Sequence, residues 1–300
     1  MIYPSKLKIG DTIGIFAPAG FYDKDLMLSH IDKFKNLGFN IKLGSHLFDT
    51  YKYLAGTDQN RAYDFMELLQ DSEVKALMAF RGGYGCIRML PHISLDVIVE
   101  NPKIICGFSD LTVLLNYISQ KTNLITYHGP MINSDLTDIM TRNSFLNCLC
   151  GNYSTLPLKF HYMPTTIYNP ANVNGTLVGG NLSLICSSLS TPYEINTDNS
   201  ILLLEDVNES PYKIDRLLSQ LLLSSKLDNC NGFIIGYVNY TDSDSNDMNS
   251  EIKDIIEELL VPLGKPIILG YPFGHSYPNL CLPLGANVTL DIDNNKLIIS

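Results

Sequence analysis

Ser109 lies between a short apolar run and a helical pattern, a position that suits a nucleophile. Residues 104–106 are expected to form a buried strand, and the leucines and isoleucine at 111, 114, 115 and 118 repeat with helical spacing. So tight a turn lifts the hydroxyl to the carboxyl end of a sheet and points the helix N–H groups beside it, as in a nucleophile elbow. Leu111 replaces the second glycine of G-x-S-x-G. The alternative interpretation is a helix cap, since Ser109 and Asp110 are both good N-cap residues.

A serine nucleophile needs a base, and the base needs an acid that orients it. Two of the six histidines, His128 and His275, follow expected strands in loops rich in glycine and proline. His275 is the preferred base, and a satisfied structural histidine is the alternative. Glu205 is the first polar residue after the apolar run 201–204, which favours it as the acid. Its alternative role is an ion pair with Lys213 or Arg216.

Strand and helix signals alternate through the first half of the chain. Strands are expected at 12–17, 39–43, 75–80, 104–106 and 124–127, with helices at 28–37 and 58–70 between the first three of them. This alternation predicts a mostly parallel sheet with flanking helices. Because sites on such sheets lie at the carboxyl ends of the strands, the Pro18 turn, the loop 81–85, Ser109 and His128 should share one rim.

The second half of the chain is richer in strand signals. Prolines, asparagines and threonines interrupt residues 151–172, which we interpret as a linker. Beyond it, strands are expected at 175–179, 201–204, 232–238 and 267–269, further strand signals at 286–299, and helices around 214–221 and 252–259. We therefore predict an N-terminal α/β domain over 1–150 that carries the serine, and a C-terminal domain over 173–300 that carries Glu205 and His275.

Composition narrows the class of partner. The chain has 300 residues, 45% of them hydrophobic, and a net charge of −10, which argues against nucleic acid and anionic membranes. Seven cysteines without a C-x-x-C pair indicate reduced thiols in a cytoplasmic protein. We expect neither a signal peptide nor a membrane span.

Two patterns that resemble cofactor sites are set aside. The loop 242–247 begins like a calcium loop, but it lacks the required glycine and has Lys253 at the place of the bidentate glutamate. The glycines of residues 82–85 do not form G-x-G-x-x-G, so a dinucleotide is not expected. No H-E-x-x-H or cysteine cluster accompanies Glu205 and His275, and we predict neither a metal nor a cofactor.

Several motifs, taken together and in order, resemble those of the murein LD-carboxypeptidases, a serine peptidase family that also contains the microcin C self-immunity hydrolases. The motifs are G-D-T-I at 10–13, A-P-A at 17–19, R-G-G-Y-G at 81–85 with Arg88, G-F-S-D at 107–110, G-G-N-L at 179–182, L-E-D at 204–206, G-H at 274–275 and L-P-L-G at 282–285. Ala55-Gly56-Thr57 and the short linker resemble the LD-carboxypeptidase branch more than the microcin branch.

The resemblance implies an amidotransferase-like N-terminal domain and a swivelling β-rich α/β C-terminal domain. It assigns the triad to Ser109, Glu205 and His275, in a site that spans the two domains. It places the oxyanion hole at the backbone N–H of Asp110 and one from the Gly82-Gly83 loop, for which we take Gly83. It also implies a homodimer without a metal.

The expected reaction is hydrolysis of the bond between an L-configured centre, diaminopimelate or lysine, and the terminal D-Ala of a murein tetrapeptide. Arg81, Arg88 and Asn181 are candidates for holding the substrate's carboxylates. A nucleotide leaving group would instead need a broad aromatic platform, but the chain has no tryptophan, and Tyr162 and Tyr168 fall in the short linker. The alternatives are a microcin C-type hydrolase of the same family, and a binding protein without catalysis.

Overall fold

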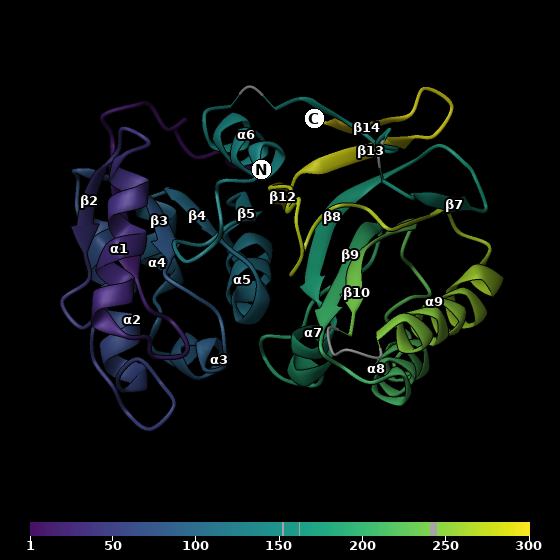
Figure 1. The fold of residues 1–300 in the computed structure, drawn as a ribbon, viewed down its shortest axis with the longest axis horizontal. Coiled ribbons are helices and arrows are strands. Elements are labelled where there is room, and N and C mark those ends of the chain that lie inside the picture. The colour runs from purple at the N-terminus through teal and green to yellow at the C-terminus, as the bar shows by residue number, and fades with distance from the viewer. Residues whose placement is uncertain (152, 162, 241–244) are drawn as a thin grey trace. The chain divides into compact units, whose positions relative to one another are not determined.

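The chain builds two sheets, each in a unit of its own (Figure 1). The computed structural model describes residues 1–151, 153–161, 163–240 and 245–300, and of residues 245–247 only the backbone. One unit comprises Met1–Asn152 and Leu280–Gly285, and the other comprises Tyr153–Asn279 and Ala286–Ser300. Tyr162 and the calcium-like part of the loop 242–247 lie outside the described residues.

The first sheet has the strand order β12-β5-β4-β3-β1-β2. Its strands are β1 (Thr12–Phe16), β2 (Asn40–Leu43), β3 (Val74–Ala79), β4 (Ile104–Gly107), β5 (Thr126–His128) and β12 (Leu282–Leu284). All neighbours are parallel except β12, which runs antiparallel to β5. The order reverses between β1 and β3, so the loops that follow these two strands flank the switch point where such sheets bind ligands.

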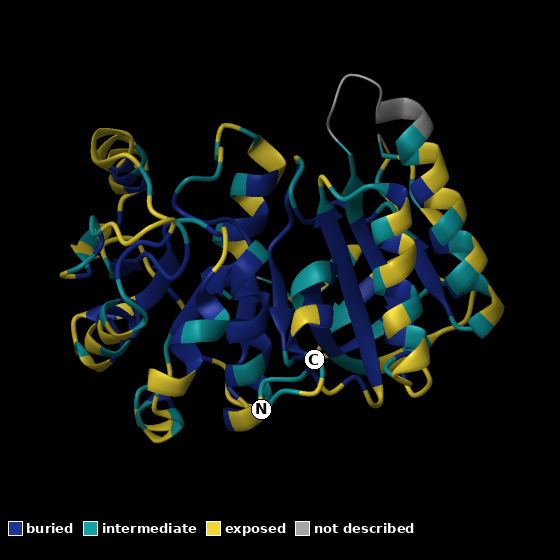
Figure 2. Cartoon of the chain, turned by 90° about the horizontal axis from the view of Figure 1, so that it is seen from below, coloured by how far each residue is buried: buried dark blue, intermediate teal, exposed yellow. Residues whose placement is uncertain are grey.

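Helices of the first unit pack in two groups. They are α1 (Lys24–Lys35), α2 (Asp58–Gln70), α3 (Cys86–Met89), α4 (Leu95–Glu100), α5 (Thr112–Thr122) and α6 (Ile139–Leu149). Helices α1 and α6 meet through the rings of Phe34 and Phe145, whereas α2 contacts α3 and α4, and α4 contacts α5. The inner strands β3 and β4 are buried almost throughout, as expected of a parallel sheet covered on both faces (Figure 2).

Helix α2 spans the predicted residues 58–70. It begins there because the Thr57 hydroxyl accepts a hydrogen bond from the Asn60 N–H at 3.1 Å and so caps the first turn. Its apolar face buries Ala62, Phe65 and Leu69. Two charged residues on this helix, Arg61 and Asp64, are also buried, which the helical pattern did not indicate.

The second sheet has the order β6-β14-β13-β8-β9-β10-β11-β7. Its strands are β6 (Thr155–Pro157), β7 (Thr166–Tyr168), β8 (Val173–Asn181), β9 (Ser200–Val207), β10 (Gly232–Asn239), β11 (Ile267–Leu269), β13 (Asn287–Asp291) and β14 (Lys296–Ile299). The four central strands β8 to β11 are parallel, and the outer ones are antiparallel. Helices α7 (Leu182–Ser188), α8 (Pro211–Leu223) and α9 (Ser245–Leu260) share one apolar core with β9 and β10.

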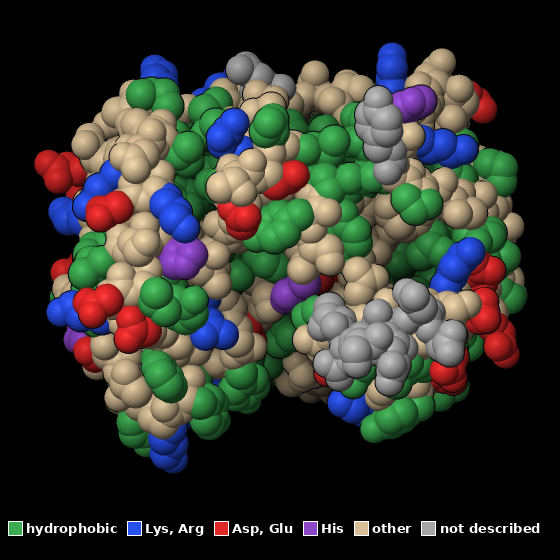
Figure 3. Space-filling model, viewed as in Figure 1, with side chains coloured by type: hydrophobic (Ala, Val, Ile, Leu, Met, Phe, Trp, Pro, Cys, Tyr) green, Lys and Arg blue, Asp and Glu red, His purple; other side chains and the backbone are tan. Residues whose placement is uncertain are grey.

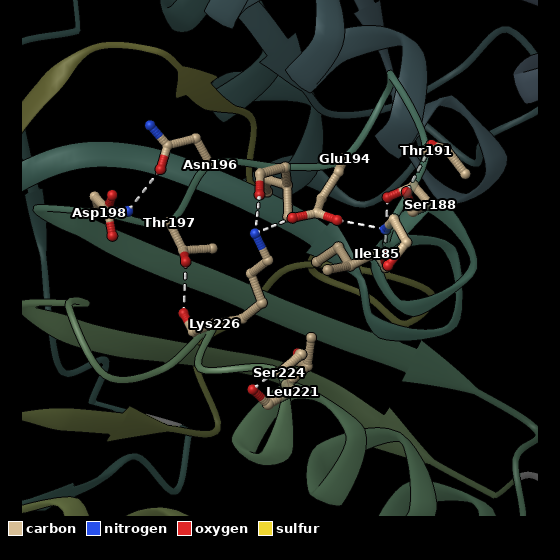
Figure 4. A network of polar contacts seen from close by, with 12 residues as sticks. Ile185, Ser188, Thr191, Glu194, Asn196, Thr197, Asp198, Leu221, Ser224 and Lys226 are labelled. Atoms are coloured by element: carbon tan, nitrogen blue, oxygen red, sulfur yellow. Dashed lines mark hydrogen bonds and ion pairs between the residues drawn. The ribbon is translucent and has the colours of Figure 1, made fainter.

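A polar network holds the loop between α7 and β9 (Figure 4). The Lys226 ammonium pairs with Glu194 and donates to the Ile195 carbonyl at 3.3 Å. The Thr197 hydroxyl donates in turn to the Lys226 carbonyl at 2.5 Å. This anchoring fixes the start of β9, the strand that ends with Glu205, Asp206 and Val207.

The expected domain division differs from the observed units in two places. Residues 151–172, interpreted as a linker, contribute β6 and β7 to the second sheet. Residues 280–285, expected in the C-terminal domain, belong to the first unit, because Leu282–Leu284 pair with β5. A three-residue edge strand leaves almost no periodic signal in a sequence, which explains both differences.

The visible surface carries charges of both signs. In the face seen in Figure 3, lysine and arginine side chains are scattered among aspartates and glutamates. Of the helices in the described part of the chain, none is long and apolar enough to cross a membrane.

Candidate active site

Ser109 is held in a strained backbone conformation directly after β4. Its φ is +64°, in the left-handed region that costs a non-glycine residue about 1–2 kcal/mol. The residue lies in a 3₁₀ turn, Ser109–Leu111, and the residue that precedes α5 is Leu111, without a side-chain cap. The conformation is that of a nucleophile elbow, and Ser109 is not the N-cap of α5. Gly107 makes room for Leu111, which stands in place of the second glycine, since a Cβ on Gly107 would lie 2.4 Å from the Leu111 side chain.

The Gly-rich loop after β3, residues 82–85, lies directly against Ser109. A Cβ on Gly82 would be 2.9 Å from both Cβ and Oγ of Ser109, and 3.5 Å from the Asp110 nitrogen. Gly83 has a φ of +132°, and a Cβ there would lie 3.2 Å from the Gly20 nitrogen. Only glycine lets this backbone approach the serine so closely, and such backbone can present N–H groups to an oxyanion.

Asp110 is completely buried behind the elbow. Its Oδ2 accepts a hydrogen bond from the Cys86 N–H at 2.8 Å, which ties the elbow to the end of the Gly-rich loop. Burial raises the pKa of Asp110, while the hydrogen bonds with Cys86 and the charge of Arg61 offset part of that rise.

Glu205 and His275 form a hydrogen-bonded pair in the second unit. Glu205 is fully buried in β9, and its Oε2 lies 2.6 Å from His275 Nδ1. Of the alternative partners, Lys213 pairs with Glu209 instead, and Arg216 lies over the Tyr212 ring. The structure thus brings together the acid and the base that the sequence suggested.

The loop that carries His275 is fixed by Gly274. This residue has a φ of +108°, and a Cβ on it would lie 2.6 Å from Glu205 Oε2. Its N–H donates to Asn279 Oδ1 at 3.0 Å. The loop therefore packs its backbone onto the carboxylate that its own histidine contacts.

The environment tunes both members of the pair. Burial alone would lower the pKa of His275, but the hydrogen bond and charge of Glu205, with the charge of Asp206, outweigh burial and raise it. Burial raises the pKa of Glu205, and the contacts with His275 offset part of that rise. A basic imidazole held by a buried carboxylate is the arrangement that general-base catalysis requires.

The three candidates for binding carboxylates have different surroundings. Arg88 donates from Nε and Nη2 to Asp58 Oδ2, at 3.1 and 2.8 Å. Buried Asn181 caps α7 by accepting from the Leu184 N–H and donates to Asp206 Oδ1. Arg81 donates to the Gly82 carbonyl and lies over the Tyr22 ring, and it makes no ion pair within the described chain. Asp206, to which the sequence motif L-E-D assigned no role, also accepts hydrogen bonds from the Ser183 N–H and hydroxyl.

His128, the other candidate base, is completely buried in β5. Its ring packs 5.9 Å from the Phe108 ring, and its backbone pairs with Gly107 in β4. Among the described residues, no cluster of three or more His, Cys, Asp or Glu side chains could hold a metal ion.

A strained serine under a glycine-rich loop and a buried Glu–His pair are the groups that serine hydrolases use. Residues 13–129 match the model of the LD-carboxypeptidase N-terminal domain, and residues 174–290 match that of the LD-carboxypeptidase C-terminal domain. The chain belongs to the LD-carboxypeptidase family of serine peptidases. Family membership makes it a hydrolase of the serine peptidase type, and the family resemblance of its sequence motifs is confirmed.

Relatives in two branches are similar to this chain. A probable murein peptide carboxypeptidase of Bacillus subtilis is 34% identical over 99% of this chain and 93% of its own length. The microcin C7 self-immunity protein MccF of Escherichia coli is 31% identical over 98% of this chain and 94% of its own length.

Solved structures confirm the two-domain α/β fold. MccF in complex with glutamyl sulfamoyl guanosine has a TM-score of 0.86 at 26% identity, covering 99% of this chain and 98% of its own. A muramoyltetrapeptide carboxypeptidase from Oxalobacter formigenes has a TM-score of 0.79 at 27% identity, covering 96% and 97%.

Proposed function

We propose that this protein is a cytoplasmic serine LD-carboxypeptidase of peptidoglycan recycling. It hydrolyses the bond between an L-configured diaminopimelate or lysine and the terminal D-Ala of a murein tetrapeptide, as a homodimer without metal or cofactor. The observation that carries the proposal is the 2.6 Å contact between Glu205 and His275 on a glycine-fixed loop. Two relatives with carboxypeptidase names, one of them a murein tetrapeptide carboxypeptidase of Pseudomonas aeruginosa that is 28% identical over 94% of each chain, support the substrate class.

In this mechanism Ser109 Oγ attacks the carbonyl carbon that precedes D-Ala, and His275 Nε2 takes the hydroxyl proton. Glu205 stabilises the imidazolium through Nδ1. The oxyanion accepts hydrogen bonds from the backbone N–H groups of Asp110 and Gly83. The intermediate collapses as His275 gives its proton to the nitrogen of D-Ala, which leaves as a free amino acid. Water, deprotonated by His275, then releases the peptide from the serine.

The leaving group determines what the site must recognise. D-Ala presents one carboxylate and one methyl group, and Arg81, which has no carboxylate partner in the described chain, supplies a cation beside the Gly-rich loop. Arg88 already donates two hydrogen bonds to Asp58 Oδ2. Asn181 already caps α7 and donates to Asp206. We therefore assign the terminal carboxylate to Arg81.

The direct test compares two peptides. The protein is incubated with a murein tetrapeptide ending in D-Ala and with the pentapeptide ending in D-Ala-D-Ala, and free D-Ala is assayed. We expect release from the tetrapeptide alone, because the terminal bond of the pentapeptide follows a D-centre. Release from the pentapeptide alone would contradict the proposal, and turnover of neither peptide would favour a binding protein.

The nucleophile is tested by substitution. Ser109→Ala should fold normally and lose about 10⁴-fold or more in kcat, and His275→Ala should fall to a similar level because the two groups act as a unit. His128→Ala is the matched histidine variant. If His128→Ala abolishes turnover while His275→Ala retains it, the base is wrongly assigned, and an active Ser109→Ala would refute the triad.

A second candidate function is cleavage of microcin C-type aminoacyl nucleotides. The 31% identity to MccF and the similarity to its complexes favour it. The absence of tryptophan from the chain counts against an aromatic platform for the base. Hydrolysis of aspartyl sulfamoyl adenosine with neither murein peptide cleaved would establish this function instead.

A further inference from the structure

Arg61 is a completely buried arginine at the end of the first turn of α2. Its side chain is 0% exposed, which is rare for arginine unless every charge is compensated. Nη1 donates to the carbonyls of Pro18 and Gly85, the latter at 2.9 Å, and Nη2 pairs with Asp58. The Arg61 guanidinium therefore binds two backbone carbonyls as well as a carboxylate.

Those two carbonyls come from the loops on either side of the switch point. Pro18 follows β1, and Gly85 ends the Gly-rich loop after β3. Gly85 has a φ of +133°, and a Cβ on it would lie 2.8 Å from Arg61 Nη1. The planar guanidinium therefore clamps both loops, with the Gly-rich loop packed directly on it.

The same loop is held from the elbow by Asp110. Asp110 Oδ2 accepts a hydrogen bond from the N–H of Cys86, the residue after Gly85. The other carboxylate oxygen of Asp110, Oδ1, has no hydrogen-bond partner in the described part of the chain. Arg61 is close enough for its charge to favour the ionised form of Asp110. The end of the loop is therefore fixed on both sides, at the Gly85 carbonyl by Arg61 and at the Cys86 N–H by Asp110.

We propose that Arg61 and the Asp110 carboxylate are positioning residues that hold the Gly-rich loop against Ser109. Neither side chain touches the substrate. They set the distance between the loop N–H groups and the serine, so they control stabilisation of the oxyanion rather than binding of the peptide. This inference rests on the proposed role of Ser109 as the nucleophile and adds the groups that align its oxyanion hole.

A matched control lies at the other end of the same helix. Lys103, immediately before β4, donates from Nζ to the Leu68 carbonyl at 3.3 Å and to that of Asp71. Burial lowers the pKa of Lys103 to about 8. Like Arg61 it donates to two backbone carbonyls. It precedes β4 whereas Ser109 follows it, so the four residues of β4, about 13 Å at 3.3 Å per residue, separate the two.

The experiment uses Arg61→Lys, Arg61→Met, Asp110→Asn, Asp110→Ala and Lys103→Met in the full chain. Three quantities are measured: the second-order rate of Ser109 labelling by a fluorophosphonate, kcat and KM on the tetrapeptide, and Tm. Labelling needs the nucleophile and the oxyanion hole but not the peptide, so it separates this inference from the choice of substrate. An unlabelled wild-type protein would instead refute the role of Ser109.

We expect Arg61→Met and Asp110→Ala to lower the labelling rate and kcat by between about 10- and 1,000-fold, the range for a misplaced oxyanion donor, with KM changed less than about threefold. Asp110→Asn keeps an acceptor for the Cys86 N–H and should recover most of the rate. Arg61→Lys keeps the charge but not the fork and should recover little. Lys103→Met should lower Tm and leave labelling unchanged.

Two results would overturn the inference. One is wild-type labelling and kcat in the Arg61 variants. The other is that Lys103→Met and Arg61→Met have the same Tm and lose the same fraction of the labelling rate. That result would mean that Arg61 has only a structural role. If Arg61→Met does not fold, the Asp110→Asn and Asp110→Ala pair decides, because equal rates in these two variants contradict positioning by the carboxylate.

Discussion

At the scale of residues, Glu205 sets the basicity of His275. Because the pKa of His275 is raised, the imidazole keeps its proton to a higher pH than an ordinary histidine, whose pKa is about 6.5. The base form appears only as pH rises through that raised value. We expect kcat/KM to fall on the acid side with an apparent pKa above 6.5 and to level off above it, as measured by a pH profile of D-Ala release.

Glu205→Gln provides the control for that profile. Without the carboxylate, burial remains as the influence that lowers the pKa of His275, so the acid limb should move to lower pH while kcat falls. A limb that stays in place in Glu205→Gln would mean that another group titrates in the wild-type profile.

The three triad candidates predicted from the sequence share one property: each lies at or after the end of an apolar run. That position favoured Ser109, Glu205 and His275 as candidates, and the family resemblance then assigned them as the triad. Arg61 gave no such signal, because an arginine three residues after Asp58 in a first helical turn looks like a solvated ion pair. Its burial depends on the Pro18 and Gly85 loops, which come from elsewhere in the chain and could not be placed beforehand.

At the scale of elements, the loop before His275 depends on Gly274, whose backbone packs against the Glu205 carboxylate. Gly274→Ala must strain its φ of +108° and displace either the carboxylate or the loop. A shift of about 1 Å in a catalytic group costs about 100-fold in rate, so we expect at least that loss of kcat. The measurement is D-Ala release at saturating tetrapeptide, together with Tm.

Gly264→Ala is the matched variant. Gly264 ends the 3₁₀ turn η3 (Val261–Leu263) with a φ of +68°, and a Cβ on it would meet nothing within 4 Å. It should cost about 1 kcal/mol of stability through its backbone alone and leave kcat unchanged. Equal losses of activity in the two variants would show that backbone strain, not the contact with Glu205, is responsible.

Long amphipathic elements were predictable, whereas short ones were not. Helix α2 has four apolar positions in register, and its bounds were predicted without error. Helices α3, α4, α6 and α7 were not predicted. In α7, for example, three of the seven residues are serine and one is cysteine, so the sequence shows little apolar periodicity. Strand β12 has three residues and a central proline, which its edge position tolerates.

At the scale of the whole molecule, the first sheet is completed by residues from near the C-terminus. A fragment of residues 1–152 lacks β12 and leaves the edge of β5 unpaired. We expect this fragment to self-associate in size-exclusion chromatography and to melt at a lower temperature than the same fragment with residues 278–287 appended. A monomeric fragment with an unchanged melting temperature would show that β12 is dispensable.

The reactivity of the seven cysteine thiols reports whether the chain is folded. Six of them are buried, and Cys150 alone is partly open to solvent. Burial raises the pKa even of Cys150, so thiolate is scarce throughout the native chain. A colorimetric thiol reagent should therefore register at most one slow equivalent in the native protein and seven once it is denatured. Every variant described above can be checked for folding in this way, without a substrate and without a spectroscopic label.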